Sequence, residues 1–542
     1  MPTLKYFIKT HTGLLFLMPY AIIMVFLGLS NSALQLDEGG DTFISSTILK
    51  YGFPYHQDDI IYTMEEGIVR DDKLFVYRTW FPYYLQAGSL LLFDKTTFAA
   101  RLPFALSGII SVIALYFFTL KLTKKKSISF LATLFLVSSV PVLIYFRTAR
   151  YVGLPILLTI LLLYSYITIF EKKRWNPWPI TIISIIYFHT MYVAFAGIIM
   201  GVLIHFYINR EAAAKENYKY VALSAIITAV LTLPWLWINF AVFEKVPQFY
   251  LSASNLIDTT NWRFIKNLVG YIFQINNYIF PLILLPLLLK KSLRPYRFEI
   301  QLCLFCISGL IFVSLLHSIP LQQYIAGTFP LLGTLLALLV VEGFSNKPIR
   351  YAITSFLILT NLIHIGPFMP LKEALLNNPK LVSNNSYMVN ISKSFIREIQ
   401  FKSIFYEHLF EISNTYKGPL DEIVAYLKIH GKPEDSCYID TERESLYFHT
   451  KMKIILRSNL KVEEAPDWII LRGNERNAIE GNSTSPTTKI LREILAKHDY
   501  SKVELNSPAM RINNSYDIQI HLFRTPSSSD KKIVIYRRTN YS

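Results

Sequence analysis

An acidic motif stands directly after the first apolar run of the chain. It reads Leu36-Asp37-Glu38-Gly39-Gly40-Asp41 and opens a long polar segment, residues 37–96. A carboxylate fixed at a membrane surface can act as a general base toward a hydroxyl or an amine. The alternative is a solvated helix cap, because acidic residues are favoured in the first turn of a helix. Asp37 and Glu38 are therefore candidate catalytic carboxylates, and Asp41 is a candidate substrate contact.

Three arginines follow in two short segments. Arg78 lies in the aromatic stretch Val76-Tyr77-Arg78-Thr79-Trp80-Phe81-Pro82-Tyr83-Tyr84, and Arg147 and Arg150 lie in Arg147-Thr148-Ala149-Arg150-Tyr151. A guanidinium group can bind a phosphate through two parallel hydrogen bonds, so all three are candidate phosphate ligands. The alternative is an interfacial helix for the aromatic stretch and snorkelling side chains for the arginines, Arg101 included.

Other polar residues stand at the ends of apolar runs. His189 and Tyr324 are candidate donor or acceptor contacts, with an ordinary interface role as the alternative. The three cysteines, Cys303, Cys306 and Cys437, form neither a disulfide framework nor the paired spacing of a zinc site. No carboxylate cluster demands a metal, and we expect neither a metal nor another cofactor to be required.

The elements that must position these residues are membrane spans. Of the 542 residues, 52% are hydrophobic and 17% charged, and the hydrophobic ones gather in runs of the length that crosses a bilayer. This excludes an ordinary cytosolic enzyme and any disordered or fibrous class. The sequence predicts a polytopic α-helical membrane protein with about eleven transmembrane helices, near residues 13–34, 97–120, 128–146, 152–170, 178–189, 191–208, 220–240, 268–289, 298–316, 324–343 and 349–369.

The basic residues set the orientation of these spans. The formal net charge of +16 would suggest nucleic acid in a soluble protein, but here Lys and Arg cluster between apolar runs, so we expect contact with membrane lipids and not with nucleic acid. The clusters fall on one side of the membrane if residues 178–208 hold two short spans that turn at Phe188-His189-Thr190. By the positive-inside rule that side is cytoplasmic, and it holds the N-terminus and the clusters Lys5/Lys9, Lys121–Lys126, Lys172–Arg174, Arg210–Lys219, Lys290–Arg297 and Lys347/Arg350.

The same orientation places residues 37–96 and everything after about residue 370 outside the cytoplasm. The first apolar run also resembles a cleavable signal, but it is longer than a typical signal core, so we expect an uncleaved span. Residues 371–542 contain short β-type runs, such as Trp468–Leu471, between helical stretches such as Leu420–Ile429. We therefore expect a membrane domain, 1–370, followed by an extracytoplasmic soluble α/β domain, 371–542.

The order of these motifs resembles a known family. Asp37-Glu38, then Arg78-Thr79-Trp80-Phe81-Pro82-Tyr83-Tyr84-Leu85, then Phe98-Ala99-Ala100-Arg101-Leu102-Pro103, then the Arg147–Tyr151 stretch look like the GT-C membrane glycosyltransferases. The chain is most similar to the branch of the dolichyl-phosphate-mannose protein mannosyltransferases and the bacterial aminoarabinose transferases. The resemblance runs over roughly residues 1–345.

This resemblance implies an inverting transferase that moves a sugar from a polyprenyl-phosphate donor to a lipid, glycan or protein acceptor at the outer face of the membrane. It also implies a bacterial inner-membrane location. Asp37 occupies the position of the family's catalytic aspartate, and Arg78 that of the basic residue that contacts the carrier phosphate. The sequence departs from the family at Gln323, where an arginine is usual, and at Val152–Pro155, which lacks the aspartate that many members carry.

Two other classes of function fit parts of the pattern. A transporter or flippase for a lipid-linked saccharide would use the same outer arginines, but transport relays usually carry charges inside the spans, where this chain has almost none. A non-catalytic membrane scaffold with an extracytoplasmic binding domain would not need Asp37. Products of sugar transfer distinguish both from a glycosyltransferase.

Overall fold

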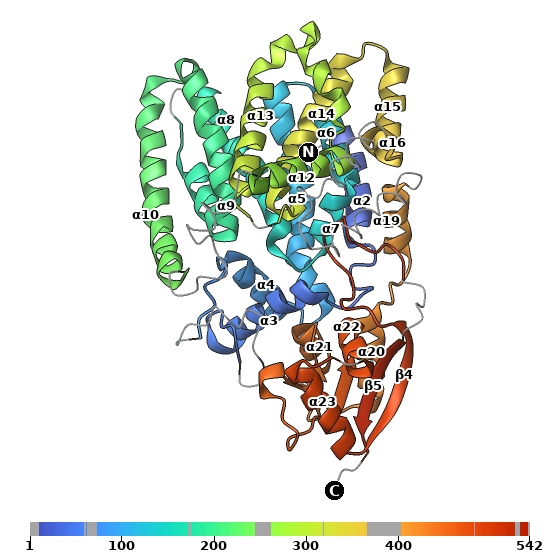
Figure 1. The fold of residues 1–542 in the computed structure, drawn as a ribbon. Coiled ribbons are helices and arrows are strands. Elements are labelled where there is room, and N and C mark those ends of the chain that lie inside the picture. The colour runs from blue at the N-terminus through green and yellow to red at the C-terminus, as the bar shows by residue number, and fades with distance from the viewer. Residues whose placement is uncertain are drawn as a thin grey trace.

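Long apolar helices form the upper part of the molecule as drawn in Figure 1, and a mixed α/β region forms its lower end. The chain is described by a computed structural model for residues 10–58, 61, 73–171, 175–243, 262–317, 319–365, 403–481, 483–525 and 532–539. The helical part consists of α2 (Thr12–Phe26), α3 (Leu36–Tyr51), α4 (Phe81–Leu92), α5 (Thr97–Thr123), α6 (Lys126–Ser138), α7 (Val140–Arg147), η1 (Tyr151–Gly153), α8 (Leu154–Glu171), α9 (Trp178–Asn209), η2 (Arg210–Ala212), η3 (Lys215–Asn217), α10 (Tyr218–Phe243), α12 (Trp262–Tyr278), η4 (Leu282–Leu289), η5 (Lys291–Tyr296), α13 (Arg297–Ser314), η6 (Gln322–Thr328), α14 (Phe329–Gly343), α15 (Lys347–Leu359) and α16 (Leu362–Ile365).

Within the described ranges, six helices are long and apolar enough to cross a membrane, and the number rises to eight if each of two bent pairs is one span. The bent pairs are α6 with α7, at 63°, and α12 with η4, at 87°. The chain is thus a polytopic helical membrane protein, whereas the number eleven stays a prediction. The first predicted span, 13–34, is too long: α2 ends at Phe26, because the chain turns there before α3 begins.

The direction of the chain reverses inside α9. Its break is at Met191, whose φ of −160° and ψ of 86° are not helical. Thr181, before the break, donates a hydrogen bond to Ser224 of α10, and the Phe206 ring, after the break, lies 5.7 Å from that of Tyr218 on the same end of α10. In one straight helix the two α9 residues would lie about 37 Å apart. The two halves therefore run antiparallel, which confirms the turn predicted from the sequence.

The helices of the bundle differ in what surrounds them. α14 is almost completely buried in the middle of the bundle. α10 stands at its edge in Figure 1 and leaves large apolar side chains uncovered, with Trp237 78% and Val230 62% exposed. Apolar surface of this extent is typical of a helix that faces lipid.

The C-terminal α/β region, residues 403–539, contains one mixed sheet. Its strand order is β2-β1-β3-β5-β4, with β2, β1 and β3 parallel and β5 antiparallel to both of its neighbours. The region consists of α19 (Ile404–Ser413), α20 (Pro419–His430), β1 (Ser436–Ile439), α21 (Arg443–Thr450), β2 (Lys453–Ile455), η8 (Arg457–Asn459), β3 (Trp468–Leu471), α22 (Gly473–Glu480), α23 (Pro486–Lys497), β4 (Tyr500–Pro508) and β5 (Lys532–Arg538).

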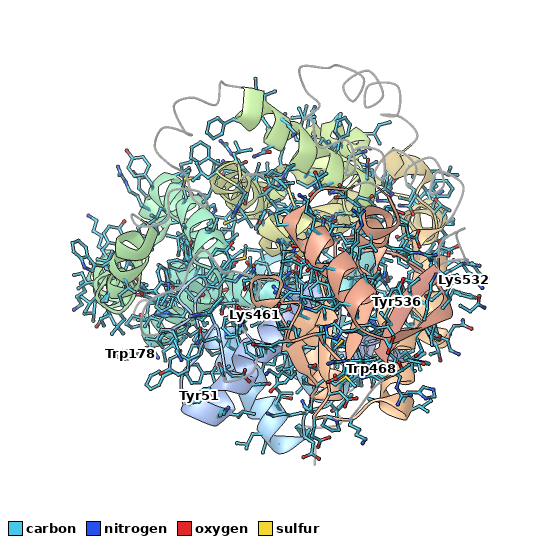
Figure 2. The ribbon with its side chains drawn as sticks, turned by 60° about the horizontal axis from the view of Figure 1, so that its bottom comes forward. Tyr51, Trp178, Lys461, Trp468, Lys532 and Tyr536 are labelled. Carbon is cyan, nitrogen blue, oxygen red and sulfur yellow. The ribbon has the colours of Figure 1, made fainter. Side chains whose placement is uncertain are left out.

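Buried apolar side chains hold this sheet together. The central strand β3 is buried along its whole length, and Trp468 is 1% exposed. Figure 2, with the bottom of the previous view brought forward, shows Trp468, Tyr536 and Lys532 on the sheet, and Tyr51 on α3, which packs against α21. The strand β4, Tyr500–Pro508, has no counterpart among the predicted strands, because most of its length is polar and only partly buried.

The C-terminal α/β region packs directly against α3. Ser445 of α21 donates a hydrogen bond to the backbone carbonyl of Gln35 at 3.1 Å. A Cβ atom added at Gly39 would lie 2.6 Å from the Ser445 backbone nitrogen, so this close approach requires glycine. Asp421 of α20 accepts a hydrogen bond from the backbone of Ala33 at 2.6 Å. The start of α3 is thereby fixed between the bundle and the C-terminal region.

Candidate active site

The first two turns of α3 present two carboxylates, Asp37 and Asp41, on one face. A capping box starts the helix: the Gln35 side chain accepts from the backbone N–H of Asp37, and the carboxylate of Glu38 accepts from that of Gln35 at 3.0 Å. Asp37 and Asp41 are four residues apart and therefore lie side by side along the helix. Glu38 points to a different side, so the acidic motif divides into two groups with different neighbours.

Asp41 is a buried carboxylate with three donors. Its side chain is 5% exposed and accepts from Arg78 Nη1 at 2.9 Å, from Arg150 Nε at 3.2 Å and from the Tyr83 hydroxyl at 3.2 Å. A buried charge needs such partners to offset the loss of its hydration. Asp41 therefore holds Arg78 and Arg150, two of the three arginines that the sequence singled out, in one place.

Arg150 connects the two carboxylates. Its side chain is 1% exposed and pairs with both Asp37 and Asp41. The guanidinium carbon lies 5.4 Å from the ring centroid of Tyr151 and 4.5 Å from that of Tyr516. Arg150 is so enclosed that it orients the carboxylates more readily than it could bind a ligand.

Asp37 is the open carboxylate of the group, with a side chain that is 42% exposed. Burial of its surroundings raises its pKa, but the positive charges of Arg150 and Arg78 and the Tyr516 side chain outweigh this effect, and the pKa of Asp37 lies below its ordinary value. The carboxylate is therefore ionised at neutral pH and within reach of solvent. It can therefore accept a proton from a group that lies within hydrogen-bond reach.

Glu38 makes a separate, buried ion pair. Its carboxylate accepts from Arg101 Nε at 2.8 Å and Nη2 at 2.7 Å, and from the backbone N–H of Ala149 at 2.6 Å. Arg101 also donates to the carbonyl of Leu29 at 2.8 Å. Of the alternatives for Arg101, snorkelling toward the interface does not hold, because Glu38 binds Arg101 in the interior at 6% exposure. Glu38 is fully buried, so a substrate cannot reach its carboxylate. The geometry therefore favours a positioning role for Glu38 over the catalytic role expected from the sequence.

Two consecutive residues thus fasten the loop after α7 to the first turn of α3. The backbone of Ala149 binds Glu38, and the side chain of Arg150 binds Asp37 and Asp41. Arg147 points elsewhere: it donates to the carbonyls of Met24 and Val25, at 3.3 and 2.9 Å, at the end of α2. A basic side chain at a helix C-terminus stabilises the last carbonyls. The geometry therefore separates Arg147 from the other two candidate phosphate ligands.

Arg78 is the more accessible of the two arginines on Asp41. Its side chain is 27% exposed. The guanidinium carbon lies 5.2 Å from the ring centroid of Tyr77 and 5.5 Å from that of Tyr151. The rings of Tyr77 and Tyr151 attract the Arg78 guanidinium and limit its rotation. Arg78 can therefore meet a ligand that enters from the open side of Asp37.

The remaining predicted residues lie around this group. Tyr324, in η6, is stacked on His317 with 3.5 Å between ring centroids and lies within electrostatic range of Arg78. His189 stands near the break in α9, with its ring 6.1 Å from that of Trp235, which in turn contacts Trp80 at 5.2 Å. Tyr324 is thus close to the arginines, whereas His189 belongs to an aromatic cluster.

Two residues in contact with the carboxylates have no place among the predicted site residues. Tyr83 lies in the aromatic stretch, where an interface role explained it. Tyr516 comes from the C-terminal α/β region, almost the whole chain away from Asp37, and no local pattern marks it. Among the described residues, no three His, Cys, Asp or Glu side chains are arranged to hold a metal ion.

Comparisons with known proteins identify similarities of sequence and of fold. Residues 78–238 match the family of the dolichyl-phosphate-mannose-protein mannosyltransferases. No curated protein sequence matches the chain. The crystal structure of ArnT from Cupriavidus metallidurans bound to undecaprenyl phosphate is similar over 97% of this chain and 98% of its own, with 11% identity and a TM-score of 0.54.

The apo form of the same protein gives a similar result, with 12% identity, a TM-score of 0.51 and the same coverage of both chains. The oligosaccharyltransferase AglB from Archaeoglobus fulgidus reaches 12% identity over 94% of this chain and 75% of its own, but its TM-score of 0.40 is too low to add to the argument. The comparisons confirm the resemblance to the GT-C-type polyprenyl-phosphate-dependent glycosyltransferases: this chain shares their fold.

Proposed function

We propose that the protein is an inverting glycosyltransferase that moves a sugar from a polyprenyl-phosphate-linked donor to a lipid, glycan or protein acceptor at the outer face of the membrane. One observation carries the proposal: Asp37 is open to solvent and ionised, while a buried arginine fixes it and a second, accessible arginine lies beside it. The fold shared with ArnT supports the same class of reaction.

In this reaction an acceptor hydroxyl or amine attacks the anomeric carbon of the donor sugar. Asp37 takes the proton from the attacking group, and the bond between the anomeric carbon and the phosphate oxygen breaks with its electron pair on the phosphate. The leaving phosphate needs no proton from a general acid, because cations can stabilise its charge. Arg78 is the residue that we assign to this task.

The other charged residues position these two. Arg150 fixes Asp37, and Asp41 fixes both arginines. Glu38 and Arg101 join the start of α3 to α5 and to the loop after α7. These residues keep Asp37 and Arg78 at a fixed distance and orientation, and they take no part in the chemical step themselves. Tyr324, near Arg78, is proposed as a further contact of donor or acceptor.

Neither a metal nor another cofactor is part of the proposal. The positive charge that a divalent cation would bring to the leaving phosphate is supplied by the guanidinium group of Arg78, which carries it at any physiological pH. Transfer should therefore proceed in the presence of a chelator, and a rate that returns only with added Mg²⁺ or Mn²⁺ would contradict this part of the proposal.

We further propose that the carboxylates face the outside of a bacterial inner membrane. The basic cluster at the far end of α5 supports this orientation: Lys121 and Lys124 pair with Glu171, and Lys125 pairs with Glu342. With 27 residues, α5 spans about 40 Å. The basic cluster and the Asp37 group thus belong to opposite ends of the bundle, and the positive-inside rule assigns the basic end to the cytoplasm.

The direct test uses purified protein in liposomes that contain a polyprenyl-phosphate-linked sugar. Mass spectrometry of the lipid, glycan and peptide fractions shows whether a sugar leaves the carrier and which acceptor gains it. The proposal predicts a product that forms with wild-type protein and far more slowly with Asp37→Asn. Movement of intact donor across the bilayer, with no change in its mass, would contradict it and identify a transporter.

A further inference from the structure

After β4, a loop of residues 509–525 leaves the sheet and enters the helical bundle. Tyr516, Ile518 and Phe523 belong to the same hydrophobic core as the membrane helices, and their exposed fractions are 8%, 0% and 7%. The Tyr516 ring centroid lies 6.4 Å from that of Tyr145 on α7. This loop is therefore part of the bundle's packing although it belongs to the C-terminal α/β region.

Tyr516 lies against the arginine of the central ion pair. The Arg150 guanidinium carbon is 4.5 Å from the centre of its ring, and the Tyr516 side chain helps to lower the pKa of Asp37, the partner of Arg150. Tyr151 offers its ring to the same guanidinium at 5.4 Å. A cation that is removed from water gains more from aromatic rings than an exposed one. The two rings thus restrict Arg150, and with it Asp37.

Hydrogen bonds fasten the loop on the N-terminal side of Tyr516. The backbone N–H of Asn513 donates to Glu442 at 2.8 Å, and its side chain accepts from the backbone N–H of Leu420 at 3.0 Å and donates to Asp421 at 3.0 Å. These contacts tie Asn513 to the start of α20, which itself binds the backbone just before α3.

An ion pair fastens the loop on the C-terminal side. His521 Nε2 lies 2.9 Å from Glu411 of α19, and the Asn514 side chain accepts from the backbone N–H of Leu522 at 2.9 Å. A residue braced on both sides loses little conformational entropy when it meets a ligand or a neighbour. Tyr516 is therefore held in a defined place by contacts that do not themselves touch the carboxylates of α3.

We propose that Tyr516 is a positioning residue of the active site, whose ring fixes the Arg150 guanidinium and whose hydroxyl orients the Asp37 carboxylate. The C-terminal α/β region thereby completes the site and is not an appended module. This inference rests on the proposed function, because it assigns Tyr516 a task in that reaction.

The hydroxyl and the ring make separable contributions. A hydroxyl that donates to a carboxylate favours its ionised form, and the groups that face Asp37 are Arg150, Arg78 and Tyr516. Asp41 is linked to Asp37 by Arg150, which pairs with both carboxylates. Tyr151 and Tyr324 lie within electrostatic range of Tyr516. Loss of the hydroxyl alone should therefore raise the pKa of Asp37 while the ring still holds Arg150.

The test compares Tyr516→Phe with Tyr438→Phe. Tyr438 is a matched control, because it is fully buried in the same region and its hydroxyl donates to Glu475 at 2.6 Å, away from α3. Each variant is assayed for kcat/KM against pH and for the pH at which a water-soluble carbodiimide modifies half of Asp37, as read by mass spectrometry. Carbodiimides react with protonated carboxyl groups, so the second readout needs no sugar transfer.

For Tyr516→Phe we expect the acid limb of kcat/KM and the half-modification pH to move upward together, with the KM for the donor unchanged. Tyr438→Phe should match wild type in both. Tyr516→Leu, which also removes the ring, should lower kcat by on the order of 10².

The inference would be overturned if Tyr516→Phe and wild type had the same pH profiles of kcat/KM and of carbodiimide modification. It would also be overturned if Tyr438→Phe shifted these profiles as far as Tyr516→Phe does. If wild-type protein transfers no sugar, the proposed function fails. A carbodiimide shift confined to Tyr516→Phe would then still support the contact between Tyr516 and Asp37.

Discussion

Replacing Glu38 with glutamine separates the structural carboxylate of α3 from the one proposed to react. Glu38 is fully buried and receives two hydrogen bonds from Arg101, which is itself 6% exposed. Glutamine fits the same volume but carries no charge, so Glu38→Gln leaves a buried guanidinium without its counter-ion. We expect this variant to be defective mainly in folding.

The size of the effect follows from burial. Breaking a buried ion pair by neutralising one partner costs about 3–5 kcal/mol of folding free energy. Glutamine also has to turn an N–H₂ group toward the donors of Arg101, Ala149 or Gln35, all of which point at the present carboxylate oxygens. Asp37→Asn should cost much less, because Arg150 keeps Asp41 as a buried partner.

The assay is thermal unfolding in detergent, followed by intrinsic fluorescence and by the fraction that elutes as a monodisperse species. Glu171→Gln is the matched control: its carboxylate pairs with Lys121 and Lys124 but is 39% exposed, so its loss should cost about 1 kcal/mol or less. We expect Glu38→Gln to unfold at a clearly lower temperature than wild type, Glu171→Gln and Asp37→Asn. A Glu38→Gln variant as stable as the control would refute the argument from burial.

Three further predictions concern the arginines, pH and orientation. Arg78→Ala should weaken donor use far more than Arg78→Lys, measured as kcat/KM for the donor, because lysine keeps the positive charge and loses only the two-pronged geometry; equal losses would return Arg78 to an interface role. Asp37 must be ionised to accept a proton, and Arg150 lowers its pKa chiefly, against the effect of burial, so kcat/KM should stay level as the pH falls until it is below the ordinary Asp value of 3.8. Arg150→Gln should move this decline of kcat/KM to higher pH, and a decline at the wild-type pH would show that Arg150 does not set the pKa of Asp37. A reporter enzyme fused after Met369 should be active outside the cytoplasm and one within Lys121–Lys126 inside, and the reverse pattern at either position would contradict the orientation.

The sequence predicts correctly that distant motifs meet at one end of the bundle. Asp37 and Arg150 stand at the ends of apolar runs, and Arg78 lies in the polar segment that Asp37 opens. Alternation of the spans brings all three to the same side. The structure joins all three through Asp41. The short reversal inside α9 was predictable for a similar reason, because only two spans in residues 178–208 keep the later basic clusters on one side.

The sequence did not predict the direction in which each of these side chains points. Glu38 and Asp37 are neighbours with the same chemistry, but the capping box and Arg101 turn Glu38 inward. Arg147 and Arg150 are three residues apart in a stretch where the helix ends, so no helical periodicity tells which of them faces α3. Only the packed structure shows that Arg147 binds carbonyls of α2 and that Arg150 binds carboxylates of α3.

Contacts from the C-terminal α/β region were beyond any local pattern. Tyr516 has no motif around it, and its place depends on how the whole region docks on α3 through Gly39 and Ser445. A glycine in an acidic motif indicates a turn as readily as a close approach. The 87° bend between α12 and η4 likewise interrupts an apolar run that reads as one span.

The most direct test of the account is the rate of sugar transfer by Asp37→Asn. The two side chains have nearly the same shape, and Asp37 is exposed enough that asparagine should leave folding and membrane insertion intact. Purified wild-type and variant proteins are compared for transfer from a polyprenyl-phosphate-linked sugar, with equal elution profiles as the control for folding. If Asp37 is the base, the rate should fall by on the order of 10²–10⁴. A folded Asp37→Asn protein that transfers sugar at the wild-type rate would remove Asp37 from the mechanism and contradict the account.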